Sequence, residues 1–143
     1  MSSGSEARAA DRRAADALTG SAPTASLTAA QAAAAKQAQD PVILAMGDIL
    51  GVTEAFVICS GRNTRQVKTI VDEVELQVRR ATGRSPLRTE GLRDLHWVLI
   101  DYGDFLVHVF LDETRSYYDL EHLWGNAPRV PWQAADVDPG STA

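Results

Sequence analysis

Residues 97–110, WVLIDYGDFLVHVF, contain two apolar runs on either side of a short polar centre. Valine, isoleucine, leucine and aromatic residues dominate both runs, and valine, isoleucine and aromatic residues favour extended strands. The centre, Asp101-Tyr102-Gly103, has the composition of a turn, because glycine readily adopts the left-handed backbone conformation that tight turns use. The segment therefore predicts a β-hairpin.

The register of this hairpin has two alternatives, which place different side chains on the same face. A three-residue loop at residues 101–103 would pair Ile100 with Asp104, Val98 with Leu106 and His96 with His108. A two-residue loop at residues 102–103 would pair Asp101 with Asp104, Leu99 with Leu106 and Trp97 with His108. The second alternative sets two carboxylates opposite each other, which destabilises paired strands, so the sequence favours the first.

Further elements precede the hairpin. Residues 42–46 and 55–59 are short apolar runs of the kind that form buried strands. In the next segment, apolar residues recur every three or four positions, which predicts an amphipathic helix with one buried side: Val67, Ile70, Val71, Val74 and Val78. Asn63 with Gln66 signals the start of this helix and Gly83 its end. Strands alternating with helices predict a single α/β domain with a mixed β-sheet flanked by helices.

The two ends of the chain lack such periodicity. Residues 1–25 predict a disordered N-terminal tail and residues 132–143 a flexible C-terminal tail, which leaves residues 26–131 as the domain. Inside that domain, Thr28 to Gln31 resembles a capping box that starts an alanine-rich helix, and Pro41 stops it. Alanine buries little area, so this helix is expected to dock loosely on its own domain or to lie on a partner.

A last helix is expected after the hairpin. Asp112 is a residue type that caps helix starts, and Gly125 is one that follows helix ends. Between them, Tyr117, Leu120 and Trp124 recur at helical spacing. The sequence therefore predicts one short helix in this region.

Charge and composition indicate the class of partner. The 143 residues have a net charge of −5 and a sequence pI of about 5.1, whereas binding driven by phosphate neutralisation needs clustered Lys and Arg. One basic cluster, Arg62, Arg65 and Lys68, is either a solvated helix face or a limited contact with an acidic partner or RNA. No apolar run approaches the roughly 20 residues that cross a bilayer, and no secretory signal is visible. A protein partner and a cytoplasmic location without a membrane are expected.

Catalytic patterns are weak. Asp101 and Asp104 could hold a metal, but no P-loop accompanies them, and a turn explains both residues. The three histidines match no zinc spacing. Cys59 lies inside an apolar run, where a thiol is usually inert. We therefore expect no catalytic residue, no metal site, no cofactor and no small-molecule substrate.

Several blocks of sequence occur in the order typical of one family. The blocks are residues 56–61 (FVICSG), 65–67 (RQV) with Ile70 and 72–74 (DEV), 90–91 (EG), 97–104 (WVLIDYGD), 107–110 (VHVF), 117–121 (YYDLE) and 123–124 (LW). Through them, residues 28 to about 131 resemble the ribosomal silencing factors of the RsfS/Iojap type. The resemblance implies a mixed-sheet fold similar to nucleotidyltransferases, without their catalytic equipment.

The same resemblance implies a function. It implies binding to the large ribosomal subunit through large-subunit ribosomal protein fourteen, at the face that the small subunit would occupy. The two subunits then cannot join, and translation is restrained when nutrients are scarce. Some relatives are dimers, so a homodimer is a further expected partner arrangement. The basic cluster described above allows a limited contact with ribosomal RNA.

Polar and aromatic residues within these blocks are the candidates for the interface. They are Glu90, Trp97, Asp101, Tyr102, Asp104, His108 and Arg65. Trp97 and Phe110 have an equally good interpretation as core residues, because most apolar strand residues are buried. Two other function classes stay open: a metal-dependent enzyme of the nucleotidyltransferase type, which would use Asp101 or Asp104, and a dimerising scaffold.

Overall fold

The computed structural model of the chain describes residues 22–133, which form an α/β domain with one five-stranded sheet. The strands are β1 (Gln39–Ala45), β2 (Ala55–Gly61), β3 (Arg88–Glu90), β4 (Trp97–Asp101) and β5 (Phe105–Leu111). Their order is β1-β2-β5-β4-β3, with β2 and β5 parallel and every other neighbouring pair antiparallel. The predicted class, a mixed sheet flanked by helices, is confirmed. Of the tails predicted for residues 1–25 and 132–143, residues 1–21 and 134–143 lie outside the described residues. Trp132, inside the second predicted tail, packs against the core, and its indole N–H donates a hydrogen bond to the carbonyl of Pro41 at 2.8 Å.

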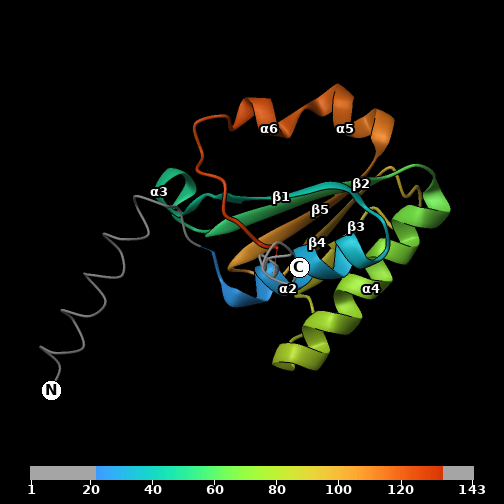
Figure 1. Cartoon of the computed structure of the whole chain (residues 1–143), viewed down its shortest axis with the longest axis horizontal. Helices are drawn as coiled ribbons and strands as arrows, with labels where there is room; N and C mark the ends of the chain where they lie inside the picture. Colours follow the sequence, from blue (N-terminus) through green and yellow to red (C-terminus); the bar gives the residue numbers. More distant parts are fainter. Residues whose placement is uncertain (1–21, 134–143) are drawn as a thin grey trace, which may run out of the picture.

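Helices cover both faces of the sheet (Figure 1). They are α2 (Thr24–Ala35), α3 (Gly47–Leu50), α4 (Thr64–Thr82), α5 (Asp112–Tyr118) and α6 (Leu120–Leu123). α2 and α4 lie on one face, where their buried alanines and valines pack on Val57, Ile100 and Val107. α5 and α6 lie on the other face, where a smaller core contains Leu44, Phe56 and Phe110, with Trp124 packed against it. The sheet therefore has two apolar cores, one on each face.

The signals at both ends of α4 act as predicted. The side-chain oxygen of Asn63 accepts a hydrogen bond from the backbone N–H of Gln66 at 2.8 Å, which satisfies one of the free donors of the first turn. Gly83 ends the helix in the left-handed conformation with φ of +77°. All five periodic apolar residues are buried. The predicted amphipathic helix is confirmed.

The prediction for the alanine-rich helix is wrong in its bounds and its packing. α2 begins at Thr24, inside the predicted tail, and ends at Ala35 rather than near Pro41. The side-chain amide of Gln66, on α4, donates hydrogen bonds to the carbonyls of Lys36 and Gln37. The backbone just after α2 is therefore hydrogen-bonded to α4 and does not continue the helix. Several α2 alanines are fully buried against α4 and the sheet. Small side chains here permit close approach instead of loose docking.

Both predicted registers of the hairpin are wrong. The structure pairs Trp97 with Phe110, Leu99 with His108 and Asp101 with Leu106. The carboxylate of Asp101 accepts a hydrogen bond from the N–H of Gly103 at 2.8 Å, which moves the tip of the turn to Gly103 and Asp104. Asp104 then forms an ion pair with Arg84 at 2.6 Å instead of facing a strand residue. The observed register is therefore a third one, supported by a local hydrogen bond within the turn and by an ion pair with the distant Arg84.

The single C-terminal helix predicted from residue spacing is also wrong. Asp119 adopts a left-handed conformation with φ of +49° and divides the segment into α5 and α6. Asp112 is the first residue of α5 and not its side-chain cap. Across the break, the guanidinium of Arg115 forms an ion pair with Glu121 at 2.8 Å, which holds the two short helices together.

Candidate functional site

One part of the sheet carries exposed side chains on the face that α5 and α6 only partly cover. Residues paired directly across antiparallel strands share a face, so the pairs given by β3, β4 and β5 define it. One row across the strands is Arg88, Asp101 and Leu106, and the next is Glu90, Leu99 and His108. We call Arg88, Glu90, Trp97, Leu99, Asp101 and Leu106 the open sheet face. α5 contacts β2 and β5, so it lies over the middle of the sheet and leaves the edge strand β3 uncovered.

The open sheet face combines apolar and charged side chains. Leu99 and Leu106 are partly exposed. Beside them, on the edge strand β3, the side chains of Arg88 and Glu90 are 64% and 58% exposed. Arg88 lies 3.2 Å from the carboxylate of Asp101 and 3.5 Å from that of Glu90. An apolar centre with a charged rim is the usual composition of a protein interface.

Trp97 lies at the border between the open sheet face and the core. Its ring is 4.8 Å from Phe110 and 4.7 Å from Tyr118, measured between centroids. Its indole N–H donates a hydrogen bond to Nδ1 of His108 at 3.1 Å. Trp97 is half-buried, whereas Phe110 is fully buried. Of the two residues that could have been either core or interface, Phe110 is therefore core, and Trp97 belongs to both core and surface.

His108 is buried, contrary to the expectation that it contacts a partner. The residue is 6% exposed, and its ring meets the ring of Phe56 edge-on with centroids 4.7 Å apart. Because Nδ1 accepts the hydrogen bond from Trp97, the proton of the neutral ring is on Nε2. Nε2 is buried and has no hydrogen-bond partner among the described residues. Burial lowers the pKa of His108 to about 4, so the folded protein holds this side chain neutral.

This burial predicts a loss of stability in mild acid. In the unfolded chain a histidine has a pKa of about 6.5, so below that value the unfolded state binds a proton that the folded state excludes. The folded pKa of His108 is about 4, and stability therefore falls as the pH falls from about 6.5 to about 4. Between pH 7 and pH 5 the contribution is about 2 kcal/mol. Urea denaturation at both values should show this loss in the wild type and a correspondingly smaller one in His108→Phe; parallel pH curves would contradict it.

Tyr102 and Asp104 lie at the tip of the hairpin, where they hold the turn in place. Tyr102 is 3% exposed and stacks on Phe105 at 4.8 Å, and burial raises the pKa of its hydroxyl to about 12. Arg84 donates to the carbonyl of Tyr102 at 2.8 Å as well as to Asp104. Tyr102 is thus part of the core on the α4 side, and its side chain is not available to a partner in this conformation.

Arg65 lies apart from the other candidates. It is exposed in the first turns of α4, which packs on the opposite face of the sheet. There it lines a shallow pocket with Gln37, Arg62 and Gln66. Of the seven predicted residues, the structure therefore places Glu90, Trp97 and Asp101 on the open sheet face, with His108 beneath them. Sequence reasoning missed Leu99 and Leu106, although alternation along each strand from Trp97 and His108 would have found them.

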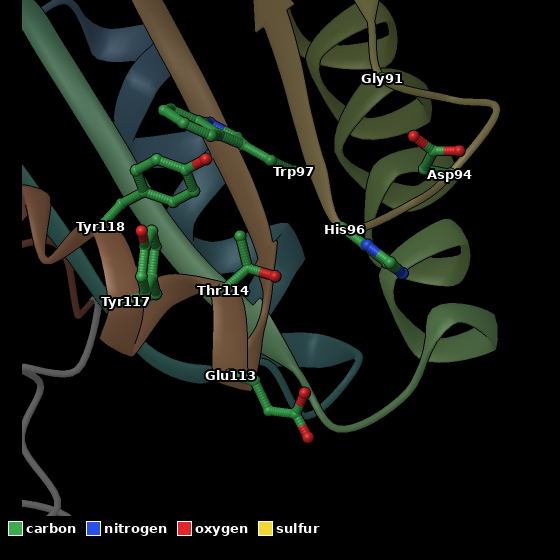
Figure 2. Close-up of a pocket in the computed structure, with 8 residues that line it drawn as sticks. All are labelled: Gly91, Asp94, His96, Trp97, Glu113, Thr114, Tyr117 and Tyr118. Carbon is green, nitrogen blue, oxygen red and sulfur yellow. The ribbon is translucent and has the colours of Figure 1, made fainter.

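A groove adjoins the open sheet face at Trp97 (Figure 2). Its volume is about 520 Å³, and it lies between α5 and the loop that joins β3 to β4. Eight residues line it: Gly91, Asp94, His96, Trp97, Glu113, Thr114, Tyr117 and Tyr118. Tyr117 is 81% exposed and Tyr118 is 49% exposed. Both tyrosines lie within the predicted C-terminal helix, but neither was predicted as a site residue.

Within residues 22–133 no group of three or more His, Cys, Asp or Glu side chains is placed to hold a metal ion. No helix in that range has both the length and the apolar character needed to cross a bilayer. Cys59 is fully buried in β2, and burial raises the pKa of its thiol to about 12, which keeps it protonated.

Comparison with known proteins assigns the family. The model of the family described as "ribosomal silencing factor during starvation" matches residues 19–142. The ribosomal silencing factor RsfS of Bacillus subtilis is 42% identical over 105 residues, which cover 73% of this chain and 84% of that protein. A mouse protein named mitochondrial assembly of ribosomal large subunit protein 1 is 31% identical over 91 residues, or 62% of this chain and 40% of that protein.

The fold has a counterpart among solved structures. A crystal structure of a protein from Chromobacterium violaceum superposes with a TM-score of 0.67 and is 32% identical, covering 71% of this chain and 83% of that one. Sequence and structure thus point to the same group of proteins, and the family match extends over most of the chain. The chain belongs to the ribosomal silencing factor (RsfS) family.

Proposed function

We propose that this protein binds the large ribosomal subunit through its open sheet face and prevents that subunit from joining the small one. Membership of the ribosomal silencing factor family supports the silencing activity. The name of the mouse relative, which refers to the ribosomal large subunit, supports the choice of subunit. The observation that carries the proposal is the open sheet face itself, where partly exposed apolar side chains lie beside exposed charged ones on β3, β4 and β5.

The proposed contact on the ribosome is large-subunit ribosomal protein fourteen, as the family resemblance implies. A protein partner suits the open sheet face, because burying leucines and an indole away from water is favourable. Phosphate groups of RNA offer no apolar surface against which these side chains could pack. The net charge of −5 also disfavours extensive contact with RNA. Any contact with ribosomal RNA is limited to the region of Arg65, which lies on the other side of the domain.

The proposed mechanism is steric exclusion in the cytoplasm under nutrient limitation. A surface occupied by this domain cannot at the same time be occupied by the small subunit. No bond is made or broken in this mechanism, so it needs neither a catalytic residue nor a cofactor. The activity then depends on how tightly and how long the domain stays on the large subunit.

The direct test uses purified ribosomal subunits. Large and small subunits are mixed with and without the protein, and the joined ribosomes are measured by sedimentation through a sucrose gradient. The proposal expects fewer joined ribosomes and the protein in the large-subunit fraction. Equal amounts of joined ribosomes with and without the protein would refute it, as would conversion of a nucleotide substrate by the purified protein.

A charge reversal tests the open sheet face. Glu90→Lys changes an exposed side chain that forms no buried contact, so the domain should stay folded while affinity for the large subunit falls about tenfold or more through charge mismatch. Asp72→Lys is the matched control, because Asp72 is an exposed carboxylate on α4, across the sheet. Co-sedimentation at several protein concentrations gives both affinities. Equal weakening by the two variants would mean that overall charge, and not the open sheet face, determines binding.

A further inference from the structure

The groove beside Trp97 has walls of different chemistry (Figure 2). Tyr117 and Tyr118 project from α5 on one side, and Asp94 and His96 lie on the other, in the loop before β4. The two tyrosine rings are nearly perpendicular, at 88° with centroids 5.0 Å apart, so they do not stack face to face. The groove therefore offers aromatic faces opposite a carboxylate.

The groove is held in shape by packing. Tyr118 rests on Trp97, and Trp97 rests on the buried Phe110. Across the groove, the N–H of Leu95 donates to the carbonyl of Gly91 at 2.9 Å, which closes the loop into a tight turn. A ligand would thus meet a formed site and would not need to order it first.

The charge of the groove is negative. Asp94 and Glu113 line it, and no Lys or Arg is among its eight lining residues. Within residues 22–133, neither of these carboxylates takes part in an ion pair. Carboxylates repel phosphate, whereas a cation gains both from them and from the negative faces of aromatic rings. A planar guanidinium suits both kinds of group, because it stacks on an aromatic ring and donates hydrogen bonds to a carboxylate from its edge.

We propose that this groove binds an arginine side chain of the protein partner on the large subunit. The inference rests on the proposed function. Trp97 belongs to both the groove and the open sheet face, so a partner bound to the open sheet face also contacts the adjoining groove. The open sheet face would then supply buried apolar area, and the groove would supply specificity for a basic residue at one position.

The first test measures the chemistry of the groove without ribosomes. N-acetylarginine amide is titrated into the full-length protein, and its neutral analogue N-acetylcitrulline amide is the control, while backbone and indole N–H signals are followed by NMR. The inference expects saturable shifts at Gly91, Trp97 and Tyr117 with the arginine probe and weaker ones with citrulline. No shift at these residues, equal shifts with both probes, or larger shifts with adenosine monophosphate would overturn it.

The second test measures what the groove adds to ribosome binding. The double variant Asp94→Asn and Glu113→Gln removes both charges at the surface, and Tyr117→Ala removes the most exposed ring. Each should lower affinity for the large subunit by about tenfold, the double variant through loss of the charge contact and Tyr117→Ala through loss of the cation–aromatic contact. Asp48→Asn, an exposed carboxylate on α3, is the control and should bind normally.

The outcomes separate the two proposals. If the wild type and all groove variants bind large subunits equally well, the groove inference fails and the proposed function stands. If the wild type binds no large subunits yet the arginine probe shifts the groove signals, the proposed function fails and the groove remains a site for a basic side chain. Weakening by the groove variants together with the probe result supports both.

Discussion

Arg115→Met is expected to lower the free energy of unfolding by about 3 kcal/mol or more, because it breaks a largely buried ion pair. Nε and Nη2 of Arg115 donate to the carboxylate of Glu121 at 3.1 and 2.8 Å. The guanidinium also donates to the carbonyls of Gln39 and Asp40 and to the hydroxyl of Ser60. The side chains of Arg115 and Glu121 are 11% and 21% exposed, so methionine would leave a carboxylate poorly solvated and three further groups without a donor. Urea denaturation followed by circular dichroism gives the change.

Lys68→Met provides the comparison. Lys68 also forms an ion pair, with Asp72 at 2.9 Å, but the two side chains are 49% and 61% exposed. Water and salt screen such a pair, so its loss should change the free energy of unfolding by at most about 0.5 kcal/mol. Similar effects of the two substitutions would mean that Arg115 does not hold α5 and α6 to the sheet.

Gly91→Ala is expected to cost about 3 kcal/mol of stability and to deform the groove beside Trp97. Gly91 has φ of +93°, and a methyl group built on it would overlap the carbonyl oxygen of Trp97 and lie 3.2 Å from the Cα of Val98. These neighbours are backbone atoms of β4, so they cannot rotate away as a side chain could. The loop that carries Asp94 and His96 must then move from the sheet, and affinity for the large subunit should fall together with stability.

Gly83→Ala separates the two causes of this cost. Gly83 also has a positive φ, +77°, but nothing lies within 4 Å of the position that a methyl group would take. The left-handed conformation alone costs an alanine about 1 kcal/mol, which should be the whole effect at the end of α4. Thermal or urea denaturation of both variants measures the difference. If Gly91→Ala cost no more than Gly83→Ala, the close approach of the loop to β4 would not matter.

Features that depend on residues close in sequence were predicted well. The periodic valines of α4 and the apolar runs of the central strands each indicate one burial pattern, and no alternative buries the same residues. The start of α4 depends on Asn63 and Gln66, which are three residues apart and need no distant partner. The order of the motifs along the chain also led to the RsfS family, which the comparisons confirm.

Features that depend on distant residues were predicted poorly. α2 ends just before Lys36 and Gln37, whose carbonyls accept hydrogen bonds from Gln66 about thirty residues away, and nothing in the alanine-rich segment itself indicates this contact. Asp119 breaks the predicted last helix where Arg115 and Glu121 bind across the break and Arg115 reaches β1. In both places the local pattern permits a longer helix, and tertiary hydrogen bonds favour a shorter one.

The candidate site shows the same division. Alternation within β4 and β5 already places Trp97 with Leu99 and Asp101, and His108 with Leu106, whatever the register. Which row lies opposite which depends on the turn itself and on Arg84 at the hairpin tip, and whether a residue is buried was decided by the helices above the sheet. His108 and Tyr102 therefore lie in the core although the sequence marks both as polar aromatic residues near an interface. The local alternation of a strand is a property of its own backbone, whereas exposure depends on what the rest of the chain places over it.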